Sequence, residues 1–229
     1  ATDLADLAIS LIRKAGCEYG DVRFCTYHSQ NLTARDRSLS NLSDKVSSGF
    51  AVRVLLDGAW GFAASPHKTP AEVERMVALA VEISQASRLT QQTKVQLVPV
   101  EAYKDSYITP IEIDPFTVPI TEKADLLLQI NEQLLSYGDR GVKKAFSSLQ
   151  FTREDKLFAS TVGSVIQQTT YRSSPGFGCT AIANGDAQRR SYERPPLNKG
   201  YEHINPADLL SQVDRVAQEA IEKVNAPKG

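Results

Sequence analysis

The sequence predicts an α+β fold of two consecutive units, each with a helix, an antiparallel sheet and a second helix. Two observations support this prediction. The apolar positions change from helical spacing to strand spacing and back, twice in the same order, and turn residues separate the strands. Helices that flank a run of antiparallel strands cover one face of their sheet, so each unit has two layers. A curved sheet shared by both units is a further hypothesis.

The first unit is predicted to span residues 1–88. Its first helix covers residues 4–15, where apolar residues recur at the spacing of a buried stripe, and Gly16 ends it. Strands are expected over residues 21–29 and within 31–41. A second helix runs to residue 87 and begins with the capping box Thr69-Pro70-Ala71-Glu72.

The clearest hairpin of this unit is Val46–Ser65. Its turn is Asp57-Gly58, a dipeptide that type I′ turns favour because both central residues need a positive φ. Gly61 lies between Trp60 and Phe62, which share a face, and it leaves room for the close approach of another element. The other strand has apolar residues on one face and Arg53 on the opposite face; the apolar residues are Phe50, Val52, Val54 and Leu56.

Residues 89–119 are predicted to form a linker between the units. They contain Pro99, Pro110, Pro115 and Pro119, which disfavour helices and central strands. A short strand is expected over residues 95–98.

The second unit is predicted over residues 120–229. Its first helix covers residues 121–137, with Asn131 as a polar residue on the inner face, and its last helix covers residues 205–225. Glu154-Asp155, Val162-Gly163 and Gly185-Asp186 are interpreted as turns. The expected strands are 142–153, 156–161, 164–173 and 177–184, with a fifth within 187–193.

Composition excludes several functional classes. The net charge of −1 lacks the basic excess of a nucleic-acid binder, and the pairs Lys143-Lys144 and Arg189-Arg190 are interpreted as exposed charges. No apolar run reaches the roughly 20 residues that span a bilayer, and the N-terminus does not resemble a signal peptide. Cys17, Cys25 and Cys179 form no CxxC motif, which favours reduced thiols in a cytoplasmic protein.

No residue is predicted to be catalytic or to bind a metal, and no substrate-binding residue is identified. His28, His67 and His203 are the three histidines, and each is interpreted as a structural or surface residue. There is no G-x-S-x-G elbow and no glycine-rich loop that opens a helix. Trp60, the only tryptophan, is interpreted as a core or interface anchor.

Four segments together resemble the TldD/PmbA family, and more closely its TldD branch: Gly16–Arg23, Gly49–Ser65, Asp114–Lys123 and Arg153–Ser164. The resemblance implies a cytoplasmic zinc metalloprotease of the group once called modulators of DNA gyrase. It also implies substrates that are unfolded peptides, and pairing as a homodimer or as a heterodimer with a family paralogue.

No segment of this chain resembles the zinc site of that family. Family members carry it in a C-terminal segment, on a helix reading His-Glu-x-x-x-His. No histidine here is followed by Glu or has another within a helical turn. We therefore interpret the chain as the N-terminal portion of a longer enzyme, with zinc and the catalytic domain outside it. A naturally short relative, a non-catalytic partner subunit and a free-standing interaction module are the alternatives.

Overall fold

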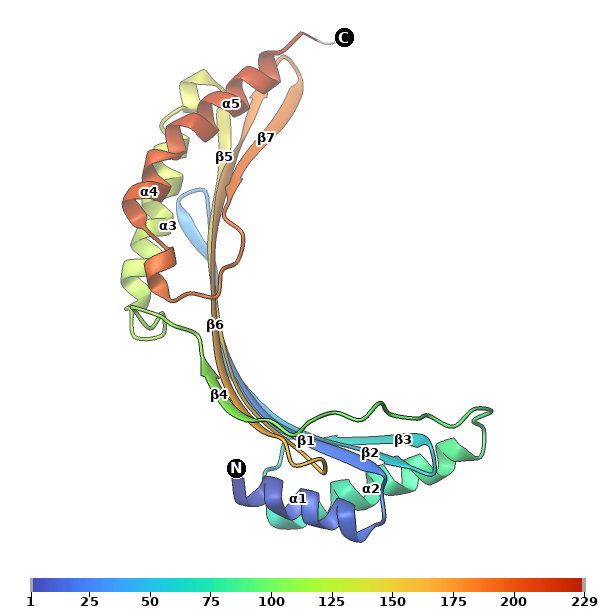
Figure 1. The fold of residues 1–229 in the computed structure, drawn as a ribbon. Helices are drawn as coiled ribbons and strands as arrows, with labels where there is room; N and C mark the ends of the chain where they lie inside the picture. Colours follow the sequence, from blue (N-terminus) through green and yellow to red (C-terminus); the bar gives the residue numbers. More distant parts are fainter. Residues whose placement is uncertain (1, 228–229) are drawn as a thin grey trace. The chain divides into compact units, whose positions relative to one another are not determined.

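The computed structural model describes residues 2–227, and its strands and helices follow one another as Figure 1 labels them. The first part contains α1 (Thr2–Lys14), β1 (Tyr19–Arg35), β2 (Ser38–Leu56), β3 (Ala59–Ser65), α2 (Pro70–Arg88) and β4 (Lys104–Ile108). The remainder contains α3 (Ile120–Leu135), η1 (Gly138–Arg140), β5 (Val142–Ser160), β6 (Val165–Ala183), β7 (Asp186–Glu193), η2 (Tyr201–His203), α4 (Pro206–Ser211) and α5 (Val213–Asn225).

Within the described residues the strands form a seven-stranded sheet of order β3-β2-β1-β5-β6-β4, with β7 also paired to β6. The β2–β3 and β6–β7 pairs are antiparallel. The short edge strand β4 is parallel to β6, with Lys104 beside Val165 and Ile108 beside Thr169. The α+β prediction is confirmed, with this one parallel pair as an addition.

The chain forms two compact units, each assembled from separate segments. The first unit contains residues 1–27, 46–108 and 154–170, and the second contains residues 28–45, 109–153 and 171–229. β1, β2, β5 and β6 each contribute residues to both units, so the hypothesis of a shared sheet is confirmed. The division at residues 88 and 119 into sequence domains stays a prediction.

Of the three predicted turns, one lies inside a long strand, whereas turns are found at Val162 and at Gly185. Glu154 and Asp155 were expected at a hairpin tip but belong to β5, which continues to Ser160. Both carboxylates have cross-strand partners, since Tyr27 donates to Glu154 at 3.0 Å and Thr169 donates to Asp155 at 2.7 Å. These partners replace the water that would bind the two carboxylates at an exposed turn.

The strand boundaries expected near residues 31–41 and 173–177 are also wrong. β1 and β2 are joined at Asp36, whose φ of 51° makes the turn. β6 continues through Pro175, which lies just before the first residue paired with β7, Gly176. A proline is tolerated where a strand lacks a ladder partner. Residues 95–98 form no strand, and the strand of this region is β4.

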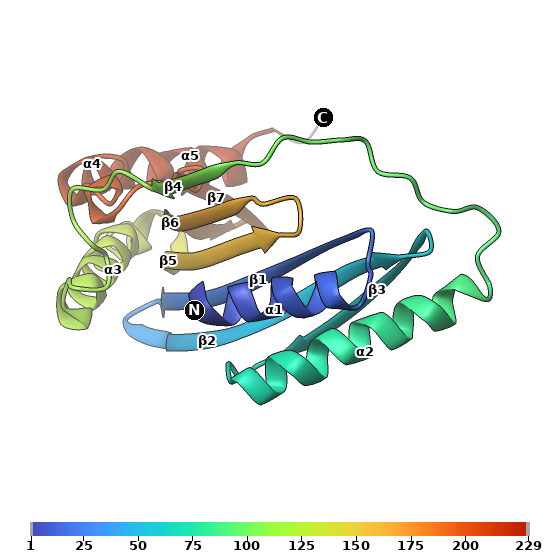
Figure 2. The ribbon, with the colours of Figure 1, turned by 60° about the horizontal axis from the view of Figure 1, so that its bottom comes forward.

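In the first unit, α1 and α2 cover the same face of the strands (Figures 1 and 2). The N-terminus of α2 forms one half of the predicted capping box, because the Thr69 hydroxyl accepts from the Glu72 N–H at 3.3 Å. The Thr69 N–H donates to the His67 carbonyl instead of to Glu72, whose carboxylate binds Arg75. The core beneath the helices is aliphatic with a stacked pair of rings, Phe24 and Phe50, at 5.1 Å. Its main members are Ala8, Ile12, Val22, Val52, Val54, Val73, Met76, Val77 and Ala80.

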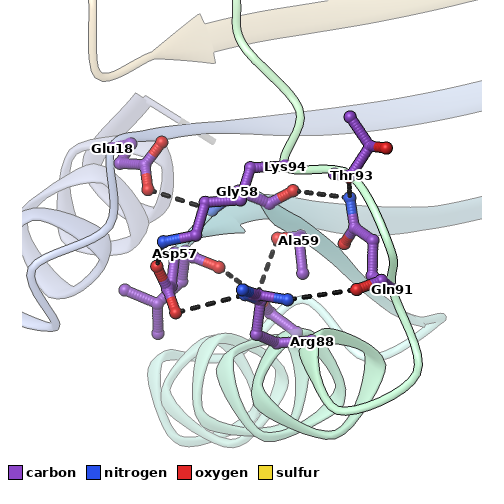
Figure 3. A network of polar contacts seen from close by, with 10 residues as sticks. Glu18, Asp57, Gly58, Ala59, Arg88, Gln91, Thr93 and Lys94 are labelled. Carbon is purple, nitrogen blue, oxygen red and sulfur yellow. Dashed lines mark hydrogen bonds and ion pairs between the residues drawn. The ribbon is translucent and has the colours of Figure 1, made fainter.

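The hairpin turn of β2 and β3 is held by charged and amide groups (Figure 3). Asp57 and Gly58 have φ values of 49° and 75°, which confirms the predicted type I′ character. Asp57 accepts from Arg88 at 3.3 Å and also pairs with Lys94, while the Gly58 N–H donates to Glu18 at 3.0 Å. The turn is therefore tied to the end of α2 and to the start of the linker.

β3 and α2 approach each other most closely at Gly61. A Cβ at this position would lie 1.8 Å from the Ala80 carbonyl oxygen and 2.7 Å from the Ser84 nitrogen. The buried Ser84 hydroxyl reaches the same strand and donates to the Ala59 carbonyl at 2.8 Å. The role predicted for Gly61, room for a close approach, is confirmed.

Replacing Gly61 by Ala should destabilise the chain by about 2–4 kcal/mol, because backbone atoms of α2 would have to move. Urea unfolding followed by circular dichroism measures this. Gly138→Ala is the matched control, since a Cβ there meets nothing within 4 Å. Equal stability of both variants would contradict the close packing of β3 on α2.

The second unit buries a lysine among its apolar residues. Lys123 of α3 is 0% exposed, and its Nζ donates to the Pro115 carbonyl at 2.5 Å and to the Gln30 side chain. The ammonium also lies over the ring of Phe151, at 4.8 Å, and over that of Tyr201, at 5.9 Å. It thereby links α3 to the preceding loop and to β1.

Burial lowers the pKa of Lys123 below its ordinary value of 10.5. Between the lowered pKa and 10.5 this side chain binds more protons in the unfolded chain than in the folded chain, so Lys123 contributes a rise with pH to the free energy of unfolding there. In Lys123→Met this rise should disappear, whereas Lys143→Met, at an exposed position, should keep it. Urea unfolding at pH 8 and pH 10 compares the variants, and an unchanged slope in Lys123→Met would show that another group is responsible.

Candidate functional site

The face of the first unit opposite its helices carries aromatic and arginine side chains. Trp60 of β3 meets Tyr19 of β1 edge to face, with ring centroids 6.0 Å apart. The Arg53 guanidinium lies 4.6 Å from the centre of the Trp60 ring. Linker residues Leu97 and Val100 border the same hollow of about 460 Å³ as these three side chains. Trp60 is half-buried here, as an anchor residue on a sheet face would be.

We call the sheet face of the first unit opposite α1 and α2 the open face. One buried carboxylate holds the arginines of the open face in place. Asp21 is 2% exposed and accepts from Arg53 through two hydrogen bonds of 2.6 and 3.0 Å. Arg23 lies 3.7 Å from the other carboxylate oxygen of Asp21. Alternation along β1 explains this arrangement, since Asp21 and Arg23 point away from the core while Val22 and Phe24 point into it.

The next residues of the open face extend this pattern onto β5. Arg23 lies 5.5 Å from the centre of the Phe158 ring. Tyr27 donates to Glu154, and this hydrogen bond is the main cause that raises the pKa of Tyr27 to about 12. Tyr27 therefore remains a neutral hydrogen-bond donor at physiological pH.

A hollow of about 480 Å³ opens on this face where β3 ends. β1 contributes Arg23, Cys25 and Tyr27 to it, and the end of β3 contributes Ala64 and Pro66. Its floor is the β2 segment Ser47–Ala51. The hollow is bounded mainly by small and apolar groups, with the arginine at its rim.

A third hollow, of about 510 Å³, lies beside β4 in the same unit and is lined by more polar groups. Lys68 enters it and donates to the Cys25 carbonyl and the Thr26 hydroxyl, both at 3.1 Å. Asp155 and Thr169, which are hydrogen-bonded to each other, also line it. These groups bind one another, so this hollow offers fewer free polar atoms than its composition suggests.

Comparison with known families identifies the chain. Residues 20–84 match the model of PmbA/TldA metallopeptidase domain 1, and residues 113–226 match that of the PmbA/TldA metallopeptidase central domain. The chain belongs to the PmbA/TldD metallopeptidase family. The resemblance inferred from the four sequence segments is thus confirmed.

Relatives and solved structures agree with this family. The chain is 25% identical to a metalloprotease of Methanocaldococcus jannaschii, over 93% of this chain and 46% of that protein. It is 22% identical to a metalloprotease of Synechocystis, over 98% of this chain and 48% of that protein. The chain therefore spans about half the length of these relatives.

Two solved structures share the fold. One, from Thermotoga maritima, is described as a modulator of a DNA gyrase; it has a TM-score of 0.72 at 15% identity and covers 100% of this chain and 49% of its own. The other is TldE from Thermococcus kodakarensis, with a TM-score of 0.62 at 13% identity, covering 95% of this chain and 47% of its own.

A metallopeptidase needs metal ligands, and residues 2–227 do not bring them together. Among these residues no group of three His, Cys, Asp or Glu side chains is placed to hold a metal ion. His28 pairs with Asp44 at 2.6 Å and stacks on Phe116, and His67 is exposed next to α2. His203 is buried in η2 rather than in an open loop, with its ring 3.3 Å from the Pro195 carbonyl.

The cysteine thiols are free, and each basic pair has one residue bound to a carboxylate. Cys17, Cys25 and Cys179 are free, and burial raises the pKa of Cys179 to about 11. Lys144 pairs with Asp36 at 3.2 Å, and Arg190 pairs with Glu219. Across the described residues, no helix has both the length and the apolar character needed to cross a bilayer.

Sequence reasoning found the hairpin but missed the surface that it forms. The hollow at the end of β3 depends on Arg23, Cys25 and Tyr27. In the sequence these residues indicate only the polar face of a strand. One signal was available. Ser65-Pro66 ends β3 opposite Phe50, so the part of β2 that begins at Ser38 extends beyond it, because proline cannot donate to a ladder.

Replacing Asp21 by Asn should lower stability by about 1–3 kcal/mol, because Arg53 would lose its buried charged acceptor. Since Arg53 also rests on Trp60, the tryptophan should become more accessible to acrylamide. Urea unfolding and fluorescence quenching test this, with Asp139→Asn at an exposed position as control. Unchanged quenching in Asp21→Asn would mean that Asp21 does not hold Arg53 in place.

Proposed function

We propose that this chain is the N-terminal portion of a zinc metallopeptidase that degrades or matures unfolded peptides, and that it shapes the substrate cavity and the subunit interface. The family of the chain supports this proposal, and so do the relatives named as metalloproteases. The chain spans about half the length of these relatives. In this proposal zinc, its ligands and the general base belong to a C-terminal catalytic domain. The enzyme acts in the cytoplasm as a homodimer or as a heterodimer with a family paralogue.

The open face is the observation that supports a binding role. It combines Trp60, Tyr19 and Tyr27 with Arg23 and Arg53, and tryptophan, tyrosine and arginine dominate the energetics of protein interfaces. Its charged groups are already paired with one another, and they include no nucleophile beside a base. The face is therefore suited to hold a polypeptide rather than to cleave it.

The alternative is a non-catalytic partner subunit or a peptide-binding module of the same family. The separation of the three histidines among the described residues favours neither reading over the other. The discriminating feature is the rest of the polypeptide. A His-Glu-x-x-x-His motif favours the peptidase, and its absence favours the partner subunit.

The test compares the 229-residue chain with the longest polypeptide that its gene encodes. The longer polypeptide should bind about one zinc per subunit and cleave reduced, alkylated casein, and a chelator should abolish the cleavage. The chain alone should do neither, as followed by metal analysis and by release of labelled fragments. Tight one-to-one zinc binding by the chain alone would contradict the proposal, and so would a longer polypeptide without zinc or cleavage.

A further inference from the structure

The segment that connects α2 to β4 is attached to the first unit only near its two ends. Near one end the Val95 N–H donates to the Gly58 carbonyl at 2.8 Å, and at the other the Tyr103 N–H donates to the Ser164 hydroxyl at 3.1 Å. In the part of the chain that the structure describes, residues 96–102 make no hydrogen bond. We call residues 96–102 the strap. It runs on the side of the strands opposite α1 and α2 (Figure 1).

The strap presents aliphatic side chains beside aromatic ones. Leu97, Val98 and Val100 are 46%, 80% and 64% exposed. Together with Tyr19 and Trp60 they line the hollow of about 460 Å³ on the open face, which we call the Trp60 hollow. Its volume and its mainly apolar and aromatic lining are typical of sites that bind small ligands or single residues. Because the strap is attached only at its ends, it can move onto an occupant and bury these aliphatic groups.

The Trp60 hollow is lined by one cation and one anion, Arg53 and Glu18. Arg53 is bound by the buried carboxylate of Asp21 through two hydrogen bonds, so its charge is already compensated. Glu18 is exposed and accepts the Gly58 N–H at 3.0 Å (Figure 3). Among the described residues Glu18 has no ion-pair partner. The uncompensated charge of the hollow is therefore negative, and its electrostatic complement is a cation.

We propose that the Trp60 hollow binds the free amino end of a peptide, with the α-ammonium beside Glu18 and the apolar side chain of the first residue between Trp60 and the strap. An α-amino group has an ordinary pKa of about 8, so at pH 7 it carries the positive charge that complements Glu18. Aromatic rings next to a carboxylate favour an ammonium with an apolar substituent. This inference rests on the proposed function and deepens it, because it names the part of a peptide that the chain recognises.

The amino end of a peptide suits the hollow better than a lysine side chain does. In a first residue the ammonium and the apolar side chain are attached to the same carbon, and Glu18 and the aromatic rings likewise line one hollow. A lysine ammonium lies at the end of a long flexible chain, so binding would immobilise several rotatable bonds. The strap does not fill the hollow with its own Val98, which is largely exposed. A small free amine is the remaining occupant, and the experiment distinguishes it.

The test measures the affinity of the 229-residue chain for two matched peptides at pH 7. One is Phe-Gly-Ser-Gly-Ser with fluorescein at its carboxyl end and a free amino group. The other has the same sequence and label with an acetylated amino group. Anisotropy gives the Kd. Binding of the unlabelled peptide is followed by the fluorescence of Trp60, the only tryptophan, which reports on the hollow directly.

Two pairs of variants locate the effect. Glu18→Gln removes the charge but keeps a side-chain carbonyl that accepts the Gly58 N–H, and Glu222→Gln makes the same change of charge at an exposed position of α5. Val98→Ser removes an aliphatic group from the strap. Val46→Ser does the same at an exposed position that does not line the Trp60 hollow. Circular dichroism checks that each variant folds.

We expect acetylation of the peptide to raise the Kd of the unchanged chain roughly threefold to fivefold, the effect of losing one partly exposed ion pair. Glu18→Gln should raise the Kd of the free peptide by the same factor and leave that of the acetylated peptide unchanged, because both changes remove the same interaction. Val98→Ser should raise both Kd values, whereas Glu222→Gln and Val46→Ser should change neither. Binding of the free peptide should shift the emission of Trp60.

Three results would overturn the inference. These are equal Kd values of the free and the acetylated peptide, an equal effect of Glu18→Gln on both peptides, or binding of phenethylamine as tight as that of the free peptide, which would assign the hollow to small amines. Cleavage of casein by the longer polypeptide is measured separately. An active longer enzyme whose chain does not discriminate the two peptides would refute this inference and leave the proposed function standing. An inactive one whose chain discriminates them through Glu18 would do the reverse.

Discussion

The contact between β3 and α2 at Gly61 is the constraint on which the first unit depends. The helix lies against the strand backbone itself, with no side chain between them, and Ser84 binds a strand carbonyl from the same helix. β3 can therefore occupy only one position beside β2. Because that position is fixed, so is the point where β3 stops, and with it the exposed edge of β2 and the adjoining hollow. The exposed edge of β2 and the hollow therefore follow from a packing requirement.

The open face shows how a sheet can stay uncovered without losing stability. Its arginines share the buried carboxylate of Asp21 and rest on the rings of Trp60 and Phe158. Charged groups on an exposed face discourage non-specific association with other sheets, while the aromatic surface stays available to a partner. The second unit uses a cation differently, since Lys123 is enclosed by carbonyl groups and rings and cannot reach a ligand.

Local signals in the sequence predicted the helices, the Asp57-Gly58 turn and the close approach at Gly61. They failed where distant residues decide the outcome. Glu154 was predicted as a turn residue, but its partner is Tyr27, far away in sequence. The burial of Lys123 likewise depends on residues outside its helix, Gln30 and Pro115. β4 has no apolar alternation because all five of its residues are exposed, so only its pairing with β6 defines it. The hollow at the end of β3 likewise forms only when β1, β2 and β3 lie in register.

The interleaving of the two units has a consequence for how the chain is made. Residues 154–170 belong to the first unit, whose other segments all end by residue 108. On a ribosome the first unit therefore cannot be completed when the linker emerges. Its sheet must wait for β5 and β6, with the inner edge of β1 exposed until they arrive. The two family domains thus occupy separate ranges of the sequence, yet the first unit can complete its fold only after β5 and β6 have been synthesised.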